Sequence, residues 1–175
     1  DYKLLQYEVN QDANERIKQL ALKNNTKVIV NTAPYVEVDD DFYKNLYMVT
    51  PNEVEAEAVT GIKVDNFENA KNAAAIFREK GVENVLITLG SNGVFVSDGN
   101  KEEIIDSFKV KTVDTTGAGD AFNGGFLAAL SEGKDIWQAA VFANAVAALS
   151  VQKLGTTPAM PSREEVDKFL EERTN

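Results

Sequence analysis

The chain alternates short β-branched runs with amphipathic helical segments, and this alternation most constrains its fold. A strand is predicted over residues 2–8, a helix over 10–24 and a second strand over 27–30. Strand, helix and strand in this order form a βαβ unit, whose crossover makes the two strands parallel. The pattern predicts an α/β fold with a doubly wound, mostly parallel sheet flanked by helices, in one domain over residues 1–175. Further strands are predicted at 47–49, 84–88 and 94–96, and helices at 39–45, 66–80, 136–152 and 163–172.

The segment Thr50-Pro51-Asn52-Glu53 predicts the N-terminus of a helix. Thr50 is the predicted N-cap, Pro51 the first helical residue, and Glu53 completes a capping box. This reading leaves Asn52 and Glu55 unexplained, although they share one face of the helix. A capped surface helix and a functional pair are both open interpretations here.

Two later segments carry weaker expectations. An Asp98-Gly99 turn precedes residues 104–105 and 110–113, which are predicted to form short antiparallel strands at the sheet edge. Residues 153–161 are predicted to be a loop without secondary structure of its own. Ser162 is the predicted cap of the final helix.

The segment Asp114 to Phe126 carries the chemistry. Asp114-Thr115-Thr116 can turn the chain through side-chain hydrogen bonds, and Gly117-Ala118-Gly119 lets the backbone approach a ligand. Asp120 then stands at the start of a helix, whose free N–H groups and positive end suit a phosphate. A carboxylate there could take the proton from an attacking hydroxyl, so the segment is a minimal phosphoryl-transfer site. The alternative is a glycine-rich turn followed by a helix with an acidic first turn.

Glycines inside this helix favour the functional interpretation. Phe122, Phe126 and Leu130 recur every four residues and mark a buried face, with Gly124 and Gly125 between them. Each glycine costs about 1 kcal/mol relative to alanine within a helix. We therefore expect something to pack or bind closely at this glycine pair.

Composition excludes several classes of function. The 175 residues include 18 Lys and Arg against 28 Asp and Glu, a net charge of −10, which argues against nucleic-acid binding. With no Cys and no His, thiol catalysis, Ser-His-Asp chemistry and His-ligated zinc are absent. No apolar run has the length of a membrane span, so no membrane partner is expected and the cytoplasm is the expected location.

The run Asp-Thr-Thr-Gly-Ala-Gly-Asp-Ala-Phe at 114–122 resembles the C-terminal signature of the ribokinase-like (PfkB) carbohydrate kinase family. The resemblance implies that Asp120 is the catalytic base and that Gly117, Ala118 and Gly119 form the anion hole. The implied reaction is ATP-dependent phosphorylation of the primary hydroxyl of a sugar, with ribose as the expected substrate.

Other segments match the family in order along the chain, and the resemblance gives them roles. Asn52 and Glu55 lie near the phosphates and the magnesium ion, Asn144 lies against the adenine, and Glu8 contacts the sugar together with Asp120. The nucleotide is also contacted by the segment from Thr88, through Leu89, Gly90, Ser91 and Asn92, to Gly93, and by Asn52, Gly119 and Asp120. A potassium ion is implied at Asp114, Thr116, Ser150, Lys153, Gly155 and Ala159.

The front of the family pattern is missing. Family members carry an N-terminal segment with a Gly-Gly sugar motif and a small β-sheet lid, and this chain opens without Met on a predicted strand. We therefore expect this chain to be the C-terminal portion of a longer kinase. The complete enzyme could form a homodimer, and this chain by itself could be inactive.

Three alternatives remain open. The substrate could be fructose or another sugar, because the sugar-selecting half is absent. The chain could be a nucleotide-binding module without turnover. A dinucleotide-binding oxidoreductase is disfavoured because position 122 is Phe rather than Gly, and because the glycines come late in the chain.

Overall fold

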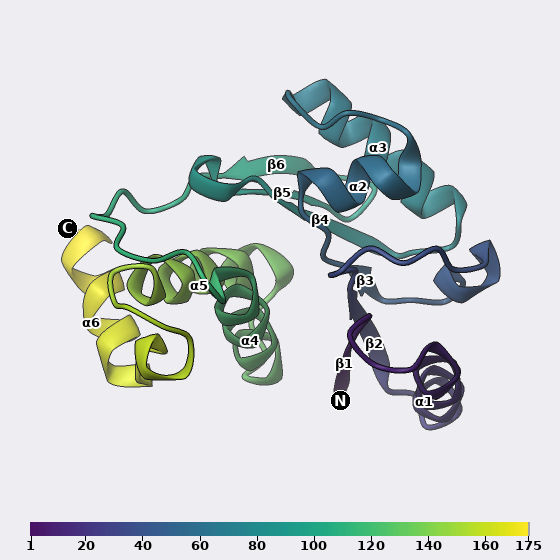
Figure 1. The fold of residues 1–175 in the computed structure, drawn as a ribbon, viewed down its shortest axis with the longest axis horizontal. Coiled ribbons are helices and arrows are strands. Elements are labelled where there is room, and N and C mark those ends of the chain that lie inside the picture. Colours follow the sequence, from purple (N-terminus) through teal and green to yellow (C-terminus); the bar gives the residue numbers. More distant parts are fainter. Residues whose placement is uncertain (175) are drawn as a thin grey trace. The chain divides into compact units, whose positions relative to one another are not determined.

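A computed structural model describes residues 1–174, and its elements follow the predicted alternation (Figure 1). The strands are β1 (Tyr2–Gln6), β2 (Lys27–Asn31), β3 (Met48–Val49), β4 (Asn84–Thr88), β5 (Val94–Ser97) and β6 (Glu102–Ile105). The α-helices are α1 (Gln11–Lys23), α2 (Glu53–Thr60), α3 (Phe67–Glu79), α4 (Ala118–Ser131), α5 (Ile136–Ser150) and α6 (Arg163–Thr174). Three 3₁₀ turns are η1 (Asp40–Tyr43), η2 (Gly90–Asn92) and η3 (Thr157–Ala159).

The chain divides into two compact units. The first contains residues 1–89 and 95–104, and the second contains residues 90–94 together with residues from 105 onward. The assignment of residues 1–175 to one domain stays a prediction.

The sheet has six strands in the order β1-β2-β3-β4-β5-β6, and β1 to β4 pair in parallel. The predicted α/β class and mostly parallel sheet are therefore confirmed. Right-handed crossovers between parallel strands in sequential order place their connections on one face of the sheet. Figure 1 shows α1 alongside β1 and β2, and α2 and α3 together beside β4.

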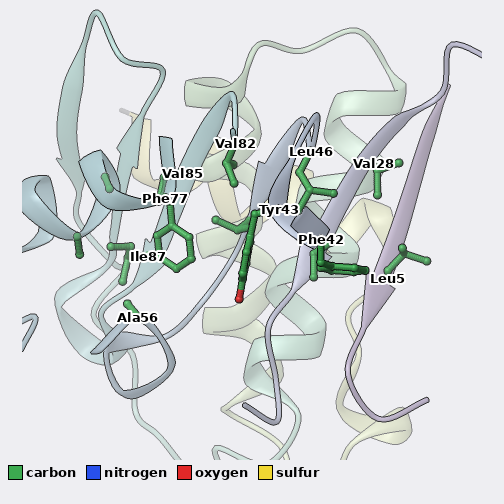
Figure 2. Close-up of a cluster of buried hydrophobic side chains, with 14 of the residues drawn as sticks. Leu5, Val28, Phe42, Tyr43, Leu46, Ala56, Phe77, Val82, Val85 and Ile87 are labelled. Carbon is green, nitrogen blue, oxygen red and sulfur yellow. The ribbon is translucent and has the colours of Figure 1, made fainter. Parts of the chain in front are cut away.

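The core of the first unit lies on that face (Figure 2). Val28, Val85 and Ile87 from the strands and Phe77 of α3 are all fully buried in this cluster, and Phe77 lies beside Val85 and Ile87 in Figure 2. The 3₁₀ turn η1 contributes Phe42 and Tyr43 to the same cluster, and the alternate strand residues Ile29, Met48 and Leu86 are buried as well. Burial on both faces explains why these strands read as continuous apolar runs.

The start of α2 differs from the sequence prediction. Its N-cap is Asn52, whose side chain accepts from the N–H of Glu55, while Glu55 accepts from the N–H of Asn52. The predicted cap at Thr50 with Glu53 is therefore wrong by two residues. The N–H of Thr50 donates to Val30 O, and Pro51 O accepts from Thr88 N, so these residues still pair with the sheet and the helix begins only after them.

Two further predictions fail. Residues 110–113 form no strand, because the N–H groups of Val113 and Asp114 both donate to Val151 O at the end of α5. The loop at 153–161 is not wholly irregular, since η3 lies within it. The predicted cap of α6 is confirmed. Ser162 Oγ accepts from the N–H of Glu165 at 3.2 Å, and the Glu165 carboxylate accepts from the N–H of Ser162 at 2.7 Å.

Candidate functional site

The N-terminus of α4 presents open backbone donors. Gly117 is the N-cap in the left-handed region with φ 76°, and it makes no side-chain capping bond. Ala118 N and Ala121 N donate to nearby carbonyls, whereas no acceptor for the N–H groups of Gly119 or Asp120 is found among residues 1–174. Both residues are exposed, so Gly119 gives the predicted anion hole a donor without an acceptor among the described residues, whereas Ala118 N–H is already bonded, and the Asp120 carboxylate stands in the same turn.

Behind this turn, α4 packs on α5 along its predicted face, and the two helices lie side by side in Figure 1. Phe122, Phe126 and Leu130 are buried as predicted. A Cβ on Gly125 would lie 2.7 Å from Val146 Cγ2 of α5, which confirms close packing there. A Cβ on Gly124 would meet nothing within 4 Å among the described residues, so close packing does not explain that glycine.

The turn that leads into α4 is held by Asp114. Its Oδ1 accepts from the N–H and the hydroxyl of Thr116 at 2.9 and 2.7 Å, and its Oδ2 accepts from Gly155 N at 2.9 Å. The pKa of the Asp114 carboxyl is lowered, first by the bond from the Thr116 N–H and then by that from Gly155. The structure therefore brings together three members of the predicted potassium set.

The other members of that set lie at the end of α5 and on the stretch that follows it. Ser150 is buried, and its carbonyl accepts from Lys153 N at 3.3 Å. Ala159 ends η3 and is buried, with its N–H on Thr156 O. Carboxylate and carbonyl oxygens are the ligands that hard cations take, so the donor set has the right chemistry for a monovalent cation.

The predicted nucleotide loop 90–93 contains the 3₁₀ turn η2 and is followed by β5. Gly93 has φ 95°, and a Cβ there would lie 2.0 Å from Ile105 O. Ser107 Oγ donates to Ser91 O at 2.5 Å. Packing thus explains Gly93, while Gly90, with φ 54°, has open space where a side chain would be.

Asn144 on α5 is buried, and its amide nitrogen donates to Ile105 O at 3.2 Å and to Asp106 O at 3.1 Å. The structure therefore gives this side chain a satisfied structural role. Contact with adenine stays a prediction.

In the first unit, Asn52 and Glu55 are joined directly. Asn52 Nδ2 donates to Glu55 Oε1 at 2.9 Å, and Glu55 Oε2 also accepts from Thr32 Oγ1 at 3.1 Å. Thr88, at the end of β4, forms an isolated parallel bridge with Asn52, so these two predicted site residues lie next to each other. Capping explains Asn52 and Glu55, contrary to the sequence interpretation, and their role toward phosphate stays a prediction.

Glu8 lies after β1 and is exposed. The preceding residue, Tyr7, donates its N–H to Ala33 O at 3.1 Å, which places this strand end beside the loop that follows β2.

Residues 1–174 contain no group of three or more His, Cys, Asp or Glu side chains placed to hold a metal ion. None of their helices combines the length and apolarity needed to cross a membrane.

Comparison with known proteins identifies the family. Residues 2–163 match the model of the pfkB family of carbohydrate kinases, so the chain belongs to that family. It is 45% identical over 171 residues to a ribokinase of Haemophilus influenzae, covering 98% of this chain and 56% of the relative. A ribokinase of Bacillus subtilis is 37% identical over 170 residues, covering 97% and 55% respectively. The chain thus spans about half the length of the curated relatives it matches.

Solved structures agree with this family. The crystal structure of a Thermotoga maritima ribokinase matches with a TM-score of 0.87 and 41% identity, over 98% of this chain and 57% of that one. The structure of an Arabidopsis thaliana ribokinase complexed with ribose and ATP matches with a TM-score of 0.93 and 32% identity, over 97% and 55%.

Sequence reasoning missed Thr32 and Ser107. Each is a hydroxyl residue shortly after a strand, and its hydroxyl donates to a residue far along the chain. Thr32 donates to the Glu55 carboxylate, and Ser107 donates to the Ser91 carbonyl. A lone hydroxyl at a strand end has no local pattern that names such a partner.

Proposed function

We propose that this chain is the nucleotide-binding and catalytic portion of an ATP-dependent sugar kinase that phosphorylates the primary hydroxyl of ribose. The observation that carries the proposal is the start of α4, where an exposed Asp120 stands beside backbone N–H groups without acceptors. Family membership and the ribokinase relatives support the reaction class and the sugar.

The proposed chemistry needs one proton acceptor and one set of anion donors. Asp120 takes the proton from the sugar hydroxyl, the hydroxyl oxygen forms a bond to the γ-phosphorus, and the bond to the β-phosphate oxygen breaks to release ADP. The N–H groups of Gly117, Ala118 and Gly119 are assigned to the charge on the transferring phosphoryl group.

The nucleotide is assigned to the segment from Thr88 to Gly93, with Asn144 toward the base and Asn52 toward the phosphates. Glu8 is assigned to the sugar.

Magnesium, when bound with ATP, neutralises charge on the β- and γ-phosphates. Glu55 is assigned a position near this ion. Its carboxylate accepts three hydrogen bonds from Thr32 and Asn52, and a carboxylate has about four acceptor sites. One acceptor site on Oε1 is left for a water or ion of this kind.

A potassium ion is assigned to Asp114 and to the carbonyl groups of Thr116, Ser150, Lys153, Gly155 and Ala159. It would add a fixed positive charge beside the turn that leads into the anion hole. The cytoplasmic location and a homodimer of the complete enzyme stay predictions.

The test is a pair of measurements on the full-length protein. Calorimetry with ATP and magnesium should detect binding, and a coupled assay for ADP should detect turnover with ribose above that with fructose. ATP binding without ADP release on any sugar would favour a nucleotide-binding module instead. No heat at millimolar ATP, with the fold confirmed by circular dichroism, would overturn the proposal.

A further inference from the structure

Residues 105–107, at the end of β6 and just beyond it, contact the loop 90–93 at two points. A Cβ on Gly93 would lie 2.0 Å from Ile105 O and 2.8 Å from Ser107 N, so the two backbones are already in contact. The Ser107 hydroxyl donates to Ser91 O at 2.5 Å, and thereby holds the middle of η2. Packing and one side-chain hydrogen bond thus tie this loop to its neighbour.

Asn144 holds the same segment from α5. Its Nδ2 lies 3.2 Å from Ile105 O and 3.1 Å from Asp106 O. A side-chain amide has two N–H donors, so both are occupied by these carbonyl groups and only Oδ1 is left as an acceptor. Asn144 itself is buried, with 6% of the residue exposed.

We propose that Ser107 is a positioning residue that sets the backbone of the 90–93 loop and so its affinity for the nucleotide, while Asn144 holds the neighbouring residues 105 and 106 from α5. The inference rests on the proposed function, because it assigns that loop to ATP. Two of its four residues are glycines, so recognition there depends largely on the direction of backbone N–H and C=O groups. A hydroxyl that fixes Ser91 O therefore acts on binding without touching the ligand.

The first test uses Ser107, which has no assigned contact with ATP. Ser107→Ala in the full-length protein should raise the Kd and KM for ATP about two- to tenfold, the range set by one net hydrogen bond. The kcat and the KM for ribose should not change. Ser107→Thr, which retains the hydroxyl, should restore the ATP affinity.

A matched control is Ser131→Ala in α4. Ser131 Oγ also donates to a backbone carbonyl, that of Ala128 at 2.7 Å, so the same type of bond is removed outside the loop. This variant should keep the wild-type Kd for ATP. An equal rise in both alanine variants would overturn the positioning role.

The second test needs no ligand. Amide hydrogen exchange at residues 91–93 should be faster in Ser107→Ala than in wild type and in Ser107→Thr. Unchanged exchange together with unchanged ATP affinity would overturn the inference. Faster exchange in a protein that binds no ATP would confirm that the hydroxyl positions the loop, and would overturn the proposed function instead.

Discussion

Asp114 Oδ2 accepts a hydrogen bond from the backbone N–H of Gly155 at 2.9 Å, across 41 positions of the chain. The bond joins the turn before α4 to the stretch that follows α5. Since Oδ1 of the same carboxylate holds Thr116, one side chain orders both segments of the proposed potassium site.

The first prediction concerns the pH dependence of stability at Asp114. Its pKa is lowered in the fold, so its contribution to stability is complete above the ordinary Asp pKa of about 3.9 and is lost as the pH falls through the folded value. Asp114→Asn should therefore melt below wild type at about pH 7, and the gap should shrink on acidification. Melting curves in sodium buffer across this range would contradict the assignment if the gap stayed constant.

The second prediction concerns potassium. If Asp114 and the carbonyl groups after α5 bind this ion, potassium should raise the wild-type Tm more than sodium at equal ionic strength, because an ion that binds only the folded state stabilises it. Asp114→Asn should lose the difference between the two salts. Superimposable wild-type melting curves in both salts would count against the site.

The third prediction concerns Asp120. Asp120→Asn should keep the Tm and the ATP affinity of the full-length protein but lower kcat with ribose by roughly 10²–10⁴-fold, because a general base is lost. Asp135→Asn is the control, since Asp135 is the N-cap of α5 and Asn caps helices equally well. Turnover of the Asp120 variant within a few-fold of wild type would refute its role as base and leave only a favourable interaction with the helix dipole.

The fourth prediction separates two adjacent glycines. Gly125→Ala should destabilise the protein by about 1–3 kcal/mol, because the new methyl would press on Val146, a β-branched residue with few rotamers in a helix. Gly124→Ala should stabilise it by about 0.4–1 kcal/mol, because the site is open and the unfolded chain loses freedom. Urea unfolding of both variants is the measurement, and equal shifts would show that the close approach at Gly125 is not a constraint.

The fifth prediction concerns the buried hydroxyl of Thr32. Thr32→Val keeps the shape but removes a bond to the Glu55 carboxylate, so the free energy of unfolding should fall by about 1.5–3 kcal/mol. Thr32→Ser keeps the hydroxyl and should lose less. A Val variant as stable as wild type would mean that Asn52 alone satisfies Glu55.

Local patterns were sufficient for the elements and for part of the site. Short β-branched runs predicted β2 and β4, period-3.6 patterning predicted α3, and the glycine pattern before Asp120 predicted the open start of α4. These features depend on neighbours within one or two turns, so the local sequence contains the information they need. Family resemblance supplied the remaining roles, which await the experiments above.

Tertiary structure decided what depends on distant partners. Whether α2 begins after Thr50 or after Asn52 was settled by sheet pairing with Val30 and Thr88. Hydrogen bonds to Val151 O kept the segment 110–113 from forming the predicted strand. The sequence by itself determined the order of strands and helices, because hydrophobic periodicity is a local property. Only the folded chain decided which of two adjacent glycines touches Val146 and which hydroxyl holds Glu55 or Ser91, because those contacts join residues that no local pattern relates.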